Sequence, residues 1–82
     1  MTTTRARVLD ELTELLRDIF AAPDLTVTPA TAAADVPGWD SMKQIEINIA
    51  VEERYGIRLS AREVDAMRSV GDLIDLIVSK SK

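Results

Sequence analysis

The residue with the clearest chemical potential is a serine at the junction between a loop and a predicted helix. Ser41 follows the segment Pro37, Gly38, Trp39 and Asp40, so its hydroxyl is expected to be exposed where the helix begins. Free backbone N–H groups and the helix dipole favour a phosphate group at such a position, by roughly 0.3–1 kcal/mol when it is exposed. The junction therefore suits a phosphate ester on the serine oxygen.

A second interpretation of Ser41 is structural. Ser41 and Gln44 have the spacing of a capping box, and Asp40 could also serve as the N-cap of the same helix. Taken alone, the local sequence favours capping over modification.

The rest of the composition contains few groups that could do chemistry with this serine. There is no cysteine and no histidine, so thiolate nucleophiles, Ser-His pairs and the commonest zinc ligands are excluded. We therefore expect no metal site and no catalytic activity, and any thiol must be supplied by a cofactor.

The charge balance limits the partners. The chain has 10 Lys and Arg and 14 Asp and Glu, which gives a formal net charge of −4. Nucleic acid is therefore not an expected partner, because binding it needs a basic surface. A basic surface on a partner protein fits this charge better. No apolar run reaches membrane-spanning length and no signal core is present, which predicts a cytoplasmic protein without membrane insertion.

The elements that must position Ser41 follow from periodicity and caps. We expect one domain over residues 1–82, an all-α four-helix bundle with helices at about 3–20, 41–55, 61–67 and 70–79. Three of these helices are long and the third in order is short. A long loop, with room for a short helical turn, separates the first two helices, and Gly56 is placed to end the second.

The helix at 41–55 carries two apolar rows whose centres lie about 150° apart on a helical wheel. The first row, free of acids, consists of Ile47, Val51 and Tyr55. The second row and its interleaved acids, called here the acidic-apolar strip, consist of Met42, Ile45, Glu46, Ile49, Glu52 and Glu53. Burying the acids unpaired would cost several kcal/mol, so the first row is expected in the core and the strip outside. The alternative is that the long loop covers Ile45 and Ile49.

Several segments together resemble the acyl carrier protein family. Residues 38–42 (GWDSM) are similar to its Asp-Ser-Leu junction, residues 45–53 to its apolar and acidic helix, and residues 55–59 (YGIRL) to its Phe-Gly-Ile segment. Residues 69–73 (SVGDL) look like the start of its last helix.

The resemblance implies a free-standing carrier, expected to be monomeric. A phosphopantetheinyl transferase would move 4′-phosphopantetheine from coenzyme A onto Ser41, and the thiol of this arm would carry acyl groups as thioesters. The pathway would be fatty-acid, polyketide or related specialised biosynthesis. The resemblance also implies contacts with acyl-loading and acyl-processing enzymes that have basic docking surfaces, through Asp40, Met42, Ile45, Glu46, Ile49, Glu52 and Glu53.

Two other functions fit the same residues. A peptidyl or aminoacyl carrier shares the arm and is loaded by an adenylating enzyme, and a helical protein-interaction module would use Ser41 only as a cap. Lys43, Asn48 and Trp39 depart from the pattern of fatty-acid carriers, which favours a specialised carrier. Trp39 would either cover the loop or be an exposed anchor for a partner.

Overall fold

The computed structural model describes residues 4–81, and this part of the chain consists of helices and connecting loops without a strand. The α-helices are α1 (Arg5–Ile19), α2 (Ser41–Tyr55), α3 (Ala61–Ala66) and α4 (Val70–Lys80), and a short 3₁₀ turn, η1 (Ala33–Asp35), interrupts the loop between α1 and α2. The prediction of an all-α bundle with three long helices, one short helix and a long first loop is confirmed.

The helix ends differ from the predicted ones by one or two residues. The helix predicted from residue 3 to residue 20 begins at Arg5, because the Thr4 side chain caps it, and it ends at Ile19. Thr3 lies outside the described residues. The two ends of the expected domain, residues 1 and 82, lie outside them as well. The short helix ends one residue early, at Ala66, and α4 continues to Lys80.

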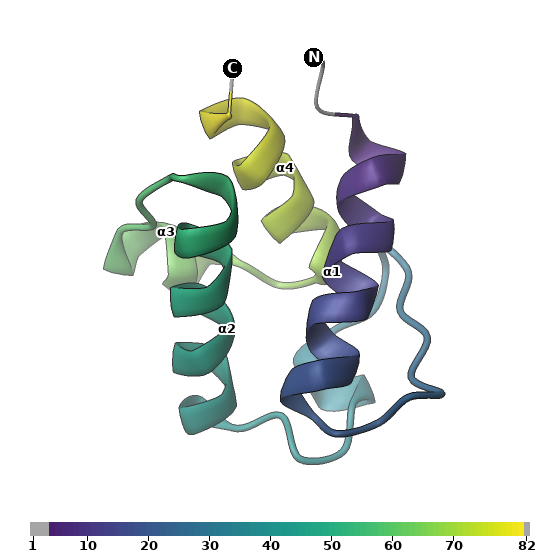
Figure 1. Cartoon of the computed structure of the whole chain (residues 1–82). Coiled ribbons are helices and arrows are strands. Elements are labelled where there is room, and N and C mark those ends of the chain that lie inside the picture. The colour runs from purple at the N-terminus through teal and green to yellow at the C-terminus, as the bar shows by residue number, and fades with distance from the viewer. Residues whose placement is uncertain (1–3, 82) are drawn as a thin grey trace.

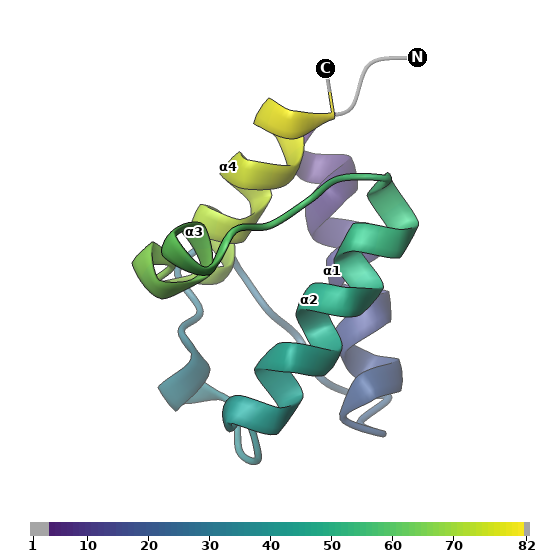
Figure 2. The ribbon, with the colours of Figure 1, turned by 90° about the vertical axis from the view of Figure 1, so that its left-hand side faces the viewer.

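Helix α1 is central, packing against both α2 and α4. Helix α1 runs antiparallel to both α2 and α4, and α2 begins at the end of the bundle opposite the chain termini (Figure 1). After a quarter turn, α3 is seen nearly end-on, lying across the others (Figure 2). The core contains the buried apolar side chains Val8, Leu12, Leu16, Val27, Ile47, Val51, Ile57, Val70, Leu73, Ile74 and Ile77.

Polar contacts reinforce the packing of α1 on its neighbours. The Tyr55 hydroxyl donates to Glu11 Oε1 at 2.7 Å, and burial, followed by this hydrogen bond, raises the pKa of Tyr55 above its ordinary value. The phenol therefore stays neutral and remains a donor across the α1–α2 contact. Arg5 forms an ion pair with Asp75 of α4.

Caps fix where the later helices begin and end. Ser60 and Glu63 form the predicted capping box of α3, and Gly56 ends α2 in the left-handed conformation, with φ 64°. The backbone N–H of Ser60 and then Lys80, whose Nζ lies 3.0 Å from the carboxylate, lower the pKa of Glu63. The Glu63–Lys80 pair also links α3 to the end of α4.

The long loop is fastened to the start of α4. The backbone N–H of Val70 donates to the Thr31 carbonyl and that of Gly71 to the Pro29 carbonyl, each at 2.8 Å. A Cβ on residue 71 would lie 2.8 Å from the Pro29 oxygen, so only glycine permits this approach. The loop is thus an ordered part of the bundle, with the η1 turn inside it.

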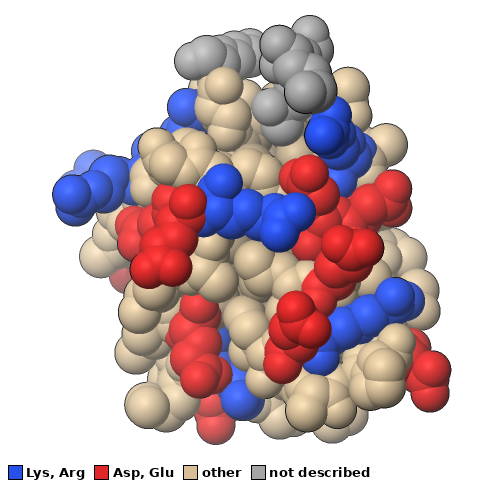
Figure 3. Space-filling model, viewed as in Figure 1, with Lys and Arg blue, Asp and Glu red and all other residues tan. Residues whose placement is uncertain are grey.

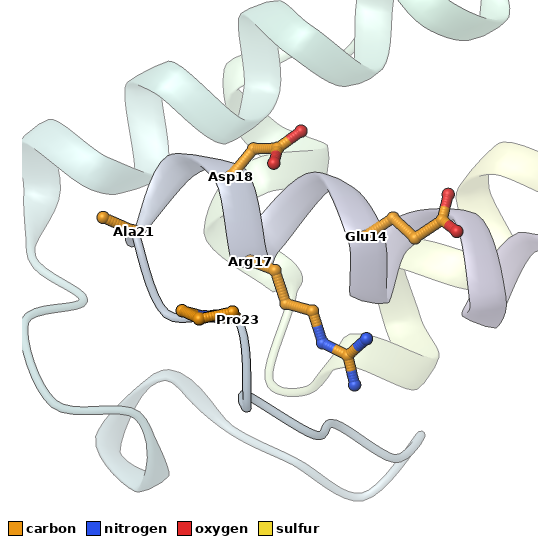
Figure 4. A pocket seen from close by; sticks show the side chains of 5 residues that line it. All are labelled: Glu14, Arg17, Asp18, Ala21 and Pro23. Atoms are coloured by element: carbon orange, nitrogen blue, oxygen red, sulfur yellow. The ribbon is translucent and has the colours of Figure 1, made fainter.

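The turn after α1 contains a non-glycine residue in the left-handed region. Ala21 has φ 51°, and the next N–H, that of Ala22, bonds back to the Arg17 carbonyl at 2.9 Å. The Arg17 Nε donates to the Leu25 carbonyl at 2.6 Å, which holds the start of the loop against α1. Figure 4 shows this turn and the open hollow of about 550 Å³ that it borders; none of the predicted site residues lines it.

Replacing Ala21 with glycine is expected to raise the free energy of unfolding by roughly 0.5–1 kcal/mol, because an L-residue is strained at positive φ and glycine is not. Urea titration at equilibrium measures the change. Gly56→Ala is the matched opposite: a Cβ there would meet no atom within 4 Å, so only the backbone is strained and stability should fall by a similar amount. A loss of stability in Ala21→Gly would contradict this interpretation.

Candidate functional site

The structure places Ser41 at the first position of α2 with its side chain exposed. The N-cap is Asp40, whose Oδ1 accepts a hydrogen bond from the Lys43 backbone N–H at 3.0 Å. The Ser41 hydroxyl makes no hydrogen bond to any residue from 4 to 81. Of the two candidate caps, Asp40 is therefore the one used, and the Ser41–Gln44 capping box is wrong.

Gln44 is engaged in a different contact. Its Oε1 accepts from the Trp39 indole N–H at 2.8 Å, and its Nε2 donates to Asn48 Oδ1 at 2.9 Å. The Trp39 ring packs on Phe20 with centroids 5.7 Å apart and contacts the core. Trp39 therefore covers the loop rather than standing out as an exposed anchor.

Lys43 ties the start of α2 to the end of α1. Its Nζ donates to the Ile19 carbonyl at 3.2 Å, lies 5.8 Å from the centre of the Phe20 ring, and pairs with Glu46 at 3.2 Å. A cation close to the last carbonyls of a helix complements the helix dipole. This departure from the acidic pattern is thus explained by a contact with α1.

The apolar part of the acidic-apolar strip is exposed. Met42, Ile45 and Ile49 are 69%, 54% and 51% exposed, whereas Ile47 and Val51 of the other row are fully buried. The prediction that separated a core row from an outer row is confirmed, and the alternative in which the loop covers Ile45 and Ile49 is wrong. Three large apolar side chains on one face form a surface suited to a partner.

The acidic side chains around these apolar residues differ in the contacts that they make within the protein. Asp40 caps α2, Glu46 pairs with Lys43, and Glu52 Oε2 accepts the Leu59 backbone N–H at 2.9 Å. Glu53 is exposed and forms no ion pair or hydrogen bond within residues 4–81. Acidic and basic side chains are intermixed on the face of the molecule that Figure 3 shows.

The strip ends in a hollow that sequence reasoning missed. Its volume is about 410 Å³, and it is lined by Ile49, Glu52, Glu53, Gly56, Ile57 and Arg58. The residues of the C-cap enter it because the left-handed turn at Gly56 folds the chain back beside the last turn of α2. The lining is of mixed charge, since Glu53, unpaired within the described residues, and the cationic Arg58 both border the hollow.

The start of α2 fits a phosphate-linked group. The serine oxygen is exposed and free of hydrogen bonds, and the backbone N–H groups of Ser41 and Met42 have no acceptor within the described residues. Unpaired N–H groups at a helix start favour an anion.

A four-helix bundle with an exposed serine at the start of an acid-lined helix is typical of a small carrier protein. Residues 10–77 match the family model described as "Phosphopantetheine attachment site". The chain belongs to this family of acyl carrier proteins. Its cofactor is covalently bound 4′-phosphopantetheine.

Several individual acyl carrier proteins are similar to this chain over nearly its whole length. The acyl carrier protein of Acidothermus cellulolyticus is 29% identical over 96% of this chain and 94% of its own length. The meromycolate extension acyl carrier protein of Mycolicibacterium smegmatis is 26% identical, covering 94% of this chain and 78% of its own. The solution NMR structure of a holo acyl carrier protein from Geobacter metallireducens superposes with a TM-score of 0.83 at 33% identity, covering 88% of this chain and 83% of that chain.

Proposed function

We propose that Ser41 is the residue that bears the phosphopantetheine arm. The observation that carries the proposal is that Asp40, and not Ser41, caps α2. The Ser41 hydroxyl is therefore left exposed and without a hydrogen bond within the described residues. When bound, the arm supplies the thiol on which acyl groups travel as thioesters.

In this reaction the role of the protein is to present an acceptor oxygen. Attachment forms a bond between Ser41 Oγ and the phosphorus of the pantetheine phosphate, and it breaks the phosphoanhydride of coenzyme A, releasing adenosine 3′,5′-bisphosphate. The serine proton must pass to a base of the transferase, since no side chain within residues 4–81 accepts a hydrogen bond from Ser41. The chain itself is proposed to be non-catalytic.

The acidic-apolar strip is proposed as the surface that partner enzymes recognise. Its exposed apolar side chains would occupy a shallow groove of the partner, and Glu53, free of internal pairing, would meet a basic residue there. Together with Asp40, the strip makes up the surface expected to meet the phosphopantetheinyl transferase and the acyl-loading and acyl-processing enzymes. We place the carrier in fatty-acid, polyketide or related specialised biosynthesis, working as a monomer in the cytoplasm. Within the described residues, no helix is long and apolar enough to cross a membrane.

Intact mass spectrometry tests the attachment. The apo protein, incubated with coenzyme A, magnesium and a broad-specificity phosphopantetheinyl transferase, is expected to gain the mass of one phosphopantetheinyl group, and fragmentation should place it on the peptide that contains Ser41. Ser60, an exposed serine that also stands at a helix start, is an internal control and should stay unmodified. An unchanged mass with several transferases, on a sample shown to be folded by circular dichroism, would refute the proposal.

A further inference from the structure

The sulfur of this chain is held by methionine alone. The sequence has three Met and no Cys. Met42 is 69% exposed, more than Ile45 or Ile49 of the same strip, whereas Met67 is half-buried and packs against the core. Within residues 4–81, Met42 therefore holds the sulfur that is most open to a dissolved oxidant; Met1 lies outside the described residues.

Met42 also lies where a chemical change would affect docking most. It follows Ser41 directly, as the second residue of α2, and it begins the apolar part of the acidic-apolar strip. An enzyme that acts on the Ser41 oxygen must cover the neighbouring side chain. Met42 is thus exposed in the free protein and becomes buried when such an enzyme docks, as expected of an apolar anchor.

Oxidation would change this side chain while leaving the fold intact. A peroxide transfers one oxygen to the thioether: the O–O bond breaks, the sulfur loses two electrons as the S–O bond forms, and the second oxygen leaves as water. The product, methionine sulfoxide, is polar. On exposed Met42 the new oxygen stays hydrated in the free protein, but it loses that water against the apolar atoms of a partner, which is unfavourable.

Apolar contact alone does not require sulfur at this position. The Asp-Ser-Leu junction that residues 38–42 resemble has leucine in the place of Met42. Leucine and methionine have similar volumes, and peroxide does not oxidise leucine under mild conditions. The chain therefore has an oxidisable residue where a stable one would give the same apolar surface.

We propose that Met42 is a reversible oxidation site, through which peroxide blocks docking of the phosphopantetheinyl transferase at Ser41. This inference rests on the attachment residue and the strip proposed above, and it adds a regulation of that same site. Methionine sulfoxide reductases reverse the step: two thiols of the reductant become a disulfide, and the oxygen leaves as water. New arms would then not be attached while an oxidant that attacks their thiol is present.

The test uses the apo protein, which has no thiol of its own. After treatment with hydrogen peroxide and removal of the oxidant, fragmentation should place a sulfoxide on Met42 and leave Met67 reduced, with an unchanged circular dichroism spectrum. Loading from coenzyme A by the transferase should become slower by about fivefold or more in kcat/KM. Reductases A and B together, one for each sulfoxide epimer, should restore the rate.

Variants assign the effect to one sulfur, and each is compared with itself before and after peroxide. Met42→Leu should lose the response, and Met67→Leu should keep it. Met1 is present in every variant, so its oxidation cancels in the comparison. Untreated Met42→Gln, which is polar and of similar length, should load within about twofold of the oxidised wild type.

The outcomes separate this inference from the proposals beneath it. A sulfoxide on Met42 with an unchanged loading rate, oxidation of Met67 in place of Met42, or an equal loss in Met42→Leu would overturn the inference alone. A wild-type rate in Met42→Gln would contradict both the inference and the role of Met42 in the strip. Failure to load the untreated protein would refute the attachment proposal itself, and the inference with it.

Discussion

Replacing Ser41 with alanine is expected to abolish phosphopantetheine attachment completely while changing the free energy of unfolding by less than about 0.5 kcal/mol. The acceptor oxygen is lost, but no hydrogen bond within the described residues is lost with it, because Asp40 caps the helix. Intact mass after incubation with the transferase and urea titration of the apo protein measure the two effects.

Asp40→Ala is the complementary variant. It keeps the Ser41 hydroxyl and removes the cap, so stability should fall by about 1 kcal/mol, within the usual range for a lost N-cap. The two variants together separate the anchoring residue from the capping residue. If Ser41→Ala were the more destabilising of the two, the assignment of the cap would be wrong.

The second large effect is expected from the apolar part of the acidic-apolar strip. A variant with Met42, Ile45 and Ile49 all changed to glutamine should be loaded by the transferase at least tenfold more slowly, in kcat/KM, because apolar anchors at the centre of an interface contribute on the order of 1–2 kcal/mol each. Stability should change little, since each side chain is more than half exposed. Loading rates are followed by mass spectrometry, with folding checked by circular dichroism.

A control on the same helix distinguishes docking from general damage to α2. Arg54→Gln alters an exposed residue of α2 outside the strip and should be loaded at the wild-type rate. Among the acids, Glu53→Gln should slow loading more than Glu46→Gln, because Glu46 is already paired with Lys43 and Glu53 is not paired within the described chain. An unchanged rate in the triple variant would place the recognition surface elsewhere.

Sequence periodicity was sufficient for α2 because its two faces differ so clearly. Ile47 and Val51 recur without acids, whereas Met42, Ile45 and Ile49 are interleaved with acids, so the cost of burying charge decides which face is inside. The bounds of α2 follow in the same way from a capping side chain at one end and Gly56 at the other.

The details at Ser41 could not be read from the sequence. Asp40–Lys43 and Ser41–Gln44 have the same three-residue spacing, and only the position of the first helical residue decides which side chain is the cap. The contact of Lys43 with the Ile19 carbonyl joins residues 24 positions apart, so it depends on how α1 and α2 pack. The interaction-module alternative is excluded as the main function by the match to the family over residues 10–77.

The attachment of the loop to α4 affects how the molecule opens. The first N–H groups of a helix have no partner inside it, and here those of Val70 and Gly71 are satisfied by loop carbonyls, so the loop cannot separate from the bundle without exposing them. Loop and α4 therefore belong to one cooperative unfolding unit. Helix α3 has no buried residue, so local unfolding of low free energy is concentrated in this short helix.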